Sequence, residues 1–134
     1  DLSNNRLNSN LIFTLLVVIM PRIIDEEKLL MTDKQAAAYE MHNFFKRIWD
    51  EREDENGLCY CYETGRELPF SYFRQNTCCY HHLLAKNMYP EFAFESWNIV
   101  ILHPDTHEQV EKDIDKCPRV KELTRKIKER YGTI

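Results

Sequence analysis

The segment CYHHLLAKNMYPEFAFESWNIVILHPDTHEQVE, residues 79–111, carries the pattern from which the fold is predicted. It contains four of the five histidines of the chain, two of them adjacent. The β-rich text TCCYHHLL predicts a strand that ends near His81 and His82, and residues 98–102 form a second hydrophobic strand. A proline and an aspartate at 104–105 then start a helix. The segment therefore predicts a strand, a loop, a strand and a helix.

The flanking sequence adds helices on both sides of this segment. A cap at Thr32 or Asp33, followed by apolar residues near helical period, predicts a helix over roughly 33–52. The text LCYCYETGRELPF predicts a short strand, a turn and a second short extended piece. After the proline at 118, a last amphipathic helix runs to about Tyr131. The expected fold class is therefore α+β.

The segments that connect these elements are predicted to have less regular structure. Residues 71–76 read as a loop. Tyr89 precedes a proline and so avoids the α region, which interrupts the chain after the first strand. A short helix over 91–97 is expected beyond this interruption, and Phe94 and Trp97 are expected in the core.

The charge distribution bears on nucleic-acid binding. The 134 residues carry a formal net charge of −4, which is unusual for a protein that binds phosphates through a positive excess. Basic residues nevertheless gather in 116–130, where Arg125 and Lys126 are candidates for contacts with a nucleic-acid backbone. The alternative is a solvated helix face with i,i+4 ion pairs such as Glu122 with Lys126.

The first residues contain one long apolar run, LIFTLLVVIM, at 11–20. Ten residues are too few to span a bilayer as a helix, and the flanks do not fit a signal peptide. We expect a buried strand or an interface, or an extension at 1–19 that is foreign to the domain, with Met20 as the start. Five cysteines, an odd number with two adjacent, favour a reducing compartment. A cytoplasmic protein without membrane association is expected.

Two pairs of side chains indicate metal chemistry. His107 and Glu111 are four residues apart on a predicted helix, so both project from one face and can bind one ion. His81 and His82, adjacent on extended chain, point to opposite sides unless the strand end twists. One can bind a metal while its neighbour serves another role. Such ligands suit a divalent transition metal or, with more oxygen ligands, magnesium.

These spacings resemble the HNH nuclease family, whose ββα-metal core uses a histidine at the end of the first strand, an asparagine at the second and a histidine on the helix. Asn98, His107 nine residues on and Glu111 four further match the Asn-x8-His-x3-His arrangement of nuclease colicins, with glutamate in place of the last histidine. The double histidine is similar too.

A second resemblance is to phage and bacterial HNH proteins. Their Cys-x-x-Thr/Ser-Gly-x-x-Leu motif is similar to residues 61–68, and their His-Ile-Leu-x-Lys-x-x-Tyr-Pro motif to residues 82–90. Together the two resemblances cover about residues 59–111. They do not extend to the first 58 residues or to the last 20.

The resemblance implies roles for individual residues. It implies His82 as the general base that takes a proton from water, and His81, His107 and Glu111 as ligands of one divalent metal, which would be Mg, Mn, Zn or Ni. Asn98 would orient the base or hold the loop between the strands. The implied activity is hydrolysis of DNA phosphodiester bonds. The alternative is an HNH-like module that binds nucleic acid or a protein without cutting.

Further candidates complete the expected site. Lys86 would touch a phosphate or be an ordinary solvated lysine. The candidates for a structural zinc site are Cys59, Cys61, Cys78 and Cys79. Their spacings lack the two-residue separation of a zinc knuckle. The alternative is that they are small buried apolar residues.

The expected organisation has four parts. These are an apolar segment at 1–31, a helix within 32–57, the HNH nuclease core at 58–115 and a basic amphipathic helix at 116–134. A homodimer through the apolar segment or the long helix, and a partner protein that supplies targeting, are further expectations.

Overall fold

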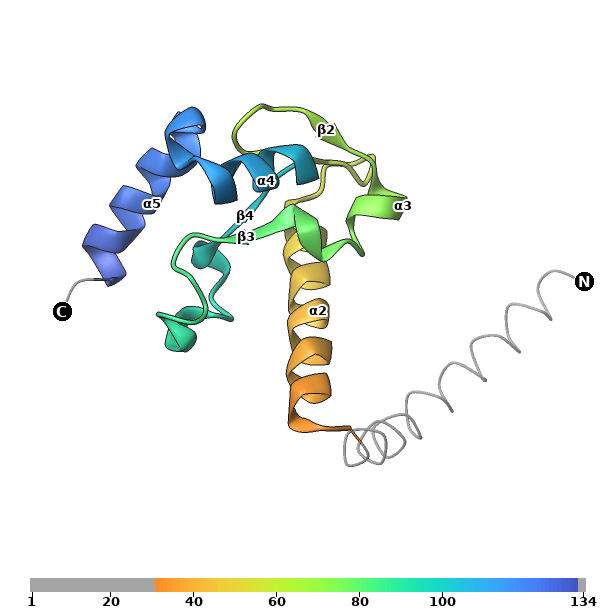
Figure 1. Cartoon of the computed structure of the whole chain (residues 1–134). Coiled ribbons are helices and arrows are strands. Elements are labelled where there is room, and N and C mark those ends of the chain that lie inside the picture. The colour runs from red at the N-terminus through yellow and green to blue at the C-terminus, as the bar shows by residue number, and fades with distance from the viewer. Residues whose placement is uncertain (1–30, 133–134) are drawn as a thin grey trace, which may run out of the picture. The chain divides into compact units, whose positions relative to one another are not determined.

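The computed structural model describes residues 31–132, apart from the side chains of residues 71 and 72, and the chain forms two compact units, 1–39 and 40–134. Helix and strand are mixed in the described part (Figure 1). The helices are α2 (Asp33–Arg52), α3 (Phe70–Phe73), α4 (Pro104–Lys112) and α5 (Pro118–Tyr131). The strands are β1 (Cys59–Tyr60), β2 (Glu67–Leu68), β3 (Tyr80–His82) and β4 (Ile99–Ile101). Strand β1 pairs with β2 and β3 with β4, both antiparallel.

The predicted helix at 33–52 is confirmed as α2. Its start is a capping box, in which the Thr32 N–H donates to Gln35 Oε1 at 3.0 Å and the Gln35 N–H donates to Thr32 Oγ1 at 3.2 Å. None of the helices in residues 31–132 has the length and hydrophobicity needed to cross a bilayer. The apolar run at 11–20, its proposed interface and the start at Met20 lie outside the described residues.

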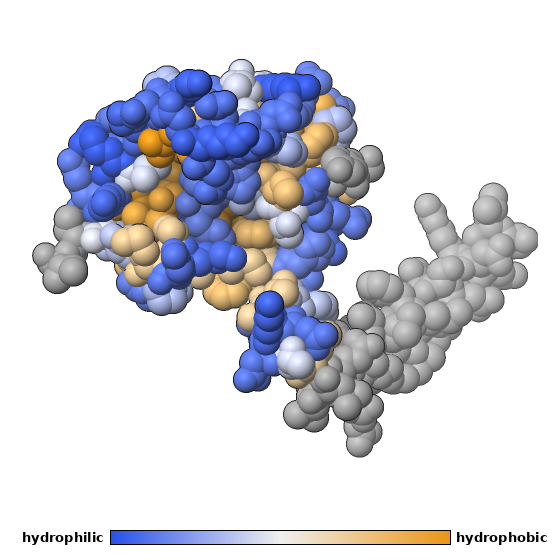
Figure 2. Space-filling model, in the orientation of Figure 1, coloured by the Kyte–Doolittle hydropathy of each residue, from blue (hydrophilic) through white to orange (hydrophobic). Residues whose placement is uncertain are grey.

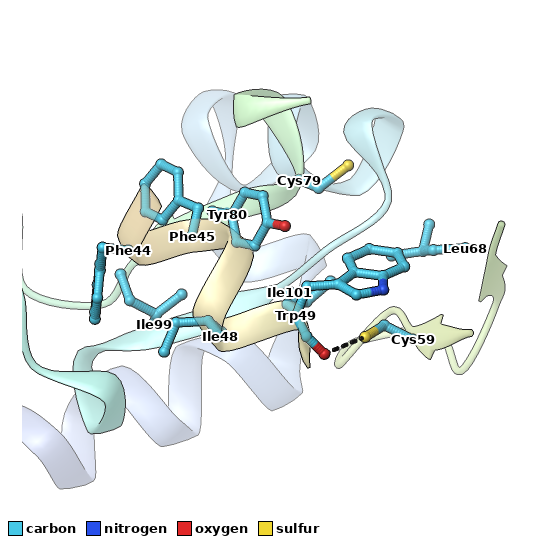
Figure 3. Packing of buried hydrophobic residues seen from close by; sticks show 10 residues of the cluster. All are labelled: Phe44, Phe45, Ile48, Trp49, Cys59, Leu68, Cys79, Tyr80, Ile99 and Ile101. Atoms are coloured by element: carbon cyan, nitrogen blue, oxygen red, sulfur yellow. Dashed lines mark hydrogen bonds between the residues drawn. The ribbon is translucent and has the colours of Figure 1, made fainter. Parts of the chain in front are cut away.

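The sheet of β3 and β4 is buried on both faces. Ile99 and Ile101 lie in one apolar cluster with the second half of α2, as Figure 3 shows around Ile48 and Trp49. Val100 lies in a second cluster. This second cluster joins β4 to the helices that follow it and consists of Cys61, Leu83, Val100, Leu102, Val110, Cys117 and Val120. Because successive side chains alternate between faces, a run of apolar residues fills both clusters.

The pairing register places the two adjacent histidines on different faces. His81 lies opposite Val100, and His82 lies opposite Ile99. Residues directly opposite each other project to the same face of a sheet. His81 therefore faces the cluster built with α4 and α5, and His82 faces α2, in agreement with the expected alternation.

The β1–β2 hairpin is fastened to both β4 and α5. The Tyr62 N–H donates to the Ile101 carbonyl at 2.9 Å. The Glu63 carboxylate accepts from the backbone N–H groups of Arg119 and Val120, at 3.2 and 2.8 Å, and so caps the first turn of α5 from a distant part of the chain. The predicted strand, turn and second strand are confirmed here, and so are the helices starting at residues 104 and 118.

Three predicted segments differ from the structure. The predicted loop at 71–76 begins within α3, a single turn that starts after a proline. The predicted strand at 77–84 is reduced to β3, because Thr77–Cys79 forms a 3₁₀ turn in which the Asn76 side chain accepts from the Cys78 N–H at 2.9 Å. The predicted helix at 91–97 is absent.

In place of that helix are two 3₁₀ turns, Pro90–Phe92 and Ser96–Asn98. Tertiary hydrogen bonds explain the interruption. The Arg52 guanidinium donates to the carbonyls of Ser96 and Ile99, both at 2.7 Å, and the Asn98 side chain donates to the Phe92 carbonyl at 3.1 Å. The Ser96 and Ile99 carbonyls thus accept from the distant Arg52, and the Phe92 carbonyl accepts from the nearby Asn98. Asn98 lies in a turn before β4 and not in the strand as predicted.

The outer surface of the described part is mostly hydrophilic in the view of Figure 2, with smaller hydrophobic areas between the hydrophilic ones. Two exposed apolar side chains, Met88 at 70% and Phe94 at 47%, belong to the loop between β3 and β4. Phe94 was expected in the core. Its ring packs edge-on against Phe44 of α2, with centroids 5.5 Å apart.

Candidate metal centre

Helix α4 presents two of the predicted ligands on one side. His103 caps the helix with its Nδ1, which accepts from the Asp105 N–H at 3.1 Å, and Pro104 follows at the first helical position. The regular helix then places His107 and Glu111 one turn apart, with His107 Nε2 and Glu111 Oε1 separated by 3.3 Å. The four-residue spacing in the sequence therefore brings one possible metal-binding atom of His107 and one of Glu111 close together.

The third predicted ligand comes from β3. His81 Nδ1 lies 3.8 Å from Glu111 Oε1, and the rings of His81 and His107 meet edge to face with centroids 5.2 Å apart. One donor atom from each of the three side chains lies within 4.8 Å of the other two. Within residues 31–132 no other three His, Cys, Asp or Glu side chains converge in this way. Two imidazoles and a carboxylate are a ligand set for a divalent transition ion.

A backbone carbonyl fixes the orientation of His107. Its Nδ1 lies 2.6 Å from the Cys78 carbonyl oxygen, so Nδ1 carries the proton and donates. The lone pair is then on Nε2, the atom that faces Glu111. Histidines that bind metals usually donate their other ring N–H to such an acceptor.

His81 is largely shielded from solvent, with 12% of its side chain exposed. Burial, together with the nearby His107 and His82, lowers the pKa of His81 to about 4. The ring is therefore neutral at pH 7 and offers a lone pair without first losing a proton.

His82 lies on the opposite face of β3. Its ring is 5.8 Å from the ring of Phe45, and its Nε2 donates to the Ala93 carbonyl at 2.9 Å, which leaves the lone pair on Nδ1. Burial lowers the pKa of His82, the Ala93 hydrogen bond partly opposes this, and the charges of Lys86 and His107 lower it further. The His82 ring is thus neutral at pH 7 and has an unprotonated Nδ1.

Asn98 is fully buried and holds the loop that leaves β3. Its Oδ1 accepts from the Leu84 N–H at 2.7 Å, and its Nδ2 donates to the carbonyls of Leu84 and Phe92, both at 3.1 Å. All of these partners are backbone groups. One amide therefore ties the first residues of the loop to its middle.

The predicted zinc cysteines do not form a ligand group. All five cysteines of the chain are free thiols; Cys78 is exposed and the other four are buried. Burial raises the pKa of Cys59 and of Cys79 to about 12, so both are neutral thiols. For Cys61, burial acts to raise the pKa, but hydrogen bonds from Thr64, the His103 backbone and Thr106 outweigh it and lower the pKa.

The predicted nucleic-acid contacts have different surroundings. Lys86 is exposed and close enough to His82 for its charge to act on that ring. Arg125 forms ion pairs with Glu122 at 2.7 Å and with Glu129 at 2.6 Å. The alternative to nucleic-acid contact was a solvated helix face with such ion pairs, and Glu122 pairs here with Arg125 where Lys126 was expected. Lys126 lines a shallow groove on α5.

Sequence reasoning did not identify the carbonyl groups of Cys78 and Ala93 as part of the site. A backbone carbonyl is common to every residue, so no side-chain pattern marks it. Phe45, against which His82 rests, appears in the sequence only as one member of an apolar stripe.

Comparisons with models of protein families, with curated protein sequences and with solved structures give no match to this chain. The interpretation of the site therefore depends on the chemistry of its side chains.

Replacing Asn98 tests its structural role. We expect Asn98→Ala to lower the free energy of unfolding by roughly 2–4 kcal/mol, because it leaves buried backbone groups of Leu84 and Phe92 without partners. Urea denaturation followed by circular dichroism measures this. Asn87→Ala, in an exposed part of the same loop, should change it by less than about 0.5 kcal/mol. Equal effects of the two substitutions would contradict the assignment.

Metal binding tests the ligand group. Isothermal titration with Zn²⁺ or Mn²⁺ should give about one site per chain, and His81→Ala, His107→Ala and Glu111→Ala should each weaken it at least tenfold, since each removes one of three ligands. His42→Ala, which alters a histidine outside the group, should bind as the parent does. Parent-like binding by His107→Ala would refute the site.

The buried His81 predicts a pH effect on stability in EDTA, which removes divalent ions. An unfolded histidine takes up a proton near pH 6.5, whereas folded His81 resists protonation down to about 4. The free energy of unfolding should therefore fall as pH drops from about 7 toward 4, by on the order of 2 kcal/mol from this residue. Denaturation at several pH values should show a smaller slope for His81→Asn. A slope equal to that of the parent would exclude this contribution.

Proposed function

We propose that this chain is a metal-dependent endonuclease of the HNH type that hydrolyses DNA phosphodiester bonds. One observation carries the proposal: His81, His107 and Glu111 converge within 4.8 Å while the adjacent His82 holds a free Nδ1 lone pair. Phosphodiester hydrolysis needs a cation and a base, and here the candidate base follows one of the candidate ligands directly in the chain. The residues present supply both.

In the proposed reaction, His82 Nδ1 takes a proton from a water molecule as its oxygen attacks phosphorus. The bond from phosphorus to the leaving oxygen breaks, and that oxygen departs with the electron pair. A divalent ion held by His81, His107 and Glu111 would stabilise the negative charge that grows on the phosphate and the leaving oxygen. His82 keeps its Nε2–H on the Ala93 carbonyl, which holds the ring in the basic tautomer.

The proposed core is β3, the loop, β4 and α4, with ligands from the first strand and the helix. This order is the ββα arrangement expected from the resemblance, and α2 and α5 flank it. In this proposal the protein acts in the cytoplasm, where free thiols are stable. Lys86, near His82, would contact the phosphate of the strand that is cut.

A non-cutting module that binds nucleic acid or a protein is the second candidate. The net charge of −4 and the pairing of Arg125 with two glutamates favour it, because both weaken attraction to phosphates. Binding without cleavage, measured by gel shift in the presence of metal, would support this candidate.

The direct test is nicking of a supercoiled plasmid with Mg²⁺, Mn²⁺, Zn²⁺, Ni²⁺ or EDTA. We expect metal-dependent cleavage by the parent and a loss of at least about a hundredfold in His82→Ala, because a general base contributes on this order. The same variant should bind metal nearly as tightly as the parent. His107→Ala should lose both properties.

His42→Ala is the control for a general effect of removing a histidine and should cut like the parent. If His82→Ala cut as fast as the parent, the assignment of the base would be wrong. If the parent cut neither double-stranded nor single-stranded DNA with any of the metals, the non-cutting module would be favoured.

A further inference from the structure

Aromatic side chains join the last turn of α5 to the loop between β3 and β4. The rings of Trp97 and Tyr131 are stacked, with centroids 3.8 Å apart and planes 15° from parallel. Phe92 contacts both rings, at 5.1 Å from Trp97 and 6.3 Å from Tyr131, and Tyr89 stacks on Phe92 at 6.2 Å. Offset and edge contacts of this kind are favourable beyond the apolar area that they bury.

This aromatic cluster, made of Tyr89, Phe92, Trp97 and Tyr131, lies directly beside the acceptor of His82. Ala93 follows Phe92 in the chain, is buried, and accepts the His82 Nε2–H through its carbonyl. In this part of the loop between β3 and β4, the regular structure consists of the 3₁₀ turns at 90–92 and 96–98. The position of the Ala93 carbonyl therefore depends on what holds the neighbouring side chains.

Two of the contacts that hold this part of the loop act on Phe92 and its neighbouring rings. Asn98 fixes the Phe92 carbonyl from inside, and Tyr131 covers the Phe92 and Trp97 rings from α5. Tyr131 belongs to a helix that contributes no metal ligand, and it is separated from His82 by 49 positions in the chain. A stacked ring that is removed leaves a space into which its neighbours shift.

We propose that Tyr131 is a positioning residue for His82, acting through Trp97 and Phe92 on the Ala93 carbonyl. The effect on cleavage rests on the proposed function, whereas the effect on the His82 ring does not. Without the Tyr131 ring the 92–93 segment moves, the hydrogen bond to Nε2 lengthens, and the ring is free to place its proton on Nδ1. That tautomer has no lone pair on the atom assigned to take the proton from water.

The test compares Tyr131→Ala with Tyr131→Phe. Nitrogen NMR at pH 8 distinguishes the two neutral tautomers of His82, whose signals are identified by their loss in His82→Gln. The parent and Tyr131→Phe, which keeps a ring, should show the Nε2–H form, and Tyr131→Ala should show a mixture. In nicking assays Tyr131→Ala should lose roughly tenfold or more in kcat with KM changed less than about twofold, since small misplacements reduce chemistry more than binding.

Ile127→Ala is the matched control. Ile127 lies one turn earlier in α5, packs on the cluster shared with Val110 and Val120, and has no aromatic ring to stack on Trp97 or Phe92. It should reduce stability while leaving the tautomer and kcat unchanged. Should Tyr131→Ala fail to fold, Tyr131→Leu fills part of the space without a ring and should give the same mixture of tautomers.

The two proposals fail in distinguishable ways. A parent that cuts nothing, combined with a changed tautomer in Tyr131→Ala, would overturn the nuclease and support the positioning. A parent that cuts, combined with a folded Tyr131→Ala that keeps the tautomer and the kcat of Ile127→Ala, would overturn the positioning alone. Titration of Zn²⁺ should give parent-like affinity in Tyr131→Ala, because all three ligands lie on β3 and α4.

Discussion

The antiparallel pairing of β3 with β4 is the constraint on which the rest of the described structure depends. Three residue pairs fix the register and bury both faces of a sheet only two strands wide. With His81 opposite Val100, its ring lies beside α4, and with His82 opposite Ile99, its ring lies beside α2. A slip of one residue would exchange the faces and separate His81 from Glu111. Apolar packing of β4 therefore determines which histidine joins the ligand group.

Irregular backbone then decides what each histidine can do. The Cys78 carbonyl, in a 3₁₀ turn before β3, takes the Nδ1–H of His107, and the Ala93 carbonyl, just after another such turn, takes the Nε2–H of His82. The two rings thus keep opposite nitrogens free. Most carbonyls of regular helices and strands accept within those elements, so the short turns between them leave carbonyls that can accept from side chains. The proposed base, His82, and the proposed ligand, His107, both depend on a backbone carbonyl from such a turn.

Sequence alone predicted the features that depend on the local spacing of residues. The spacing of apolar residues predicted α2 and α5, the proline and aspartate at 104–105 predicted the start of α4, and the i,i+4 interval placed His107 beside Glu111. The connecting turns could not be predicted, because Arg52 donates to the carbonyls of Ser96 and Ile99 far along the chain, and the Asn98 amide donates to the Phe92 carbonyl. Local preference has no information about such distant donors. For the same reason the sequence indicated His82 as a base but not the Ala93 carbonyl that selects its tautomer.

The basic helix α5 illustrates how structure changes the meaning of a charge pattern. From its composition it was a candidate to contact DNA, but Arg125 is bound by Glu122 and Glu129, and Lys121 by Asp115. Exposed pairs of this kind stabilise a fold little, yet they do reduce the net charge that a phosphate would meet. The helix itself is held at its first turn by the Glu63 carboxylate, which accepts from backbone N–H groups, and at its last turn by the stacking of Tyr131 on Trp97. In the proposed nuclease the contribution of α5 would be structural, and attraction of the substrate would depend on Lys86 beside His82.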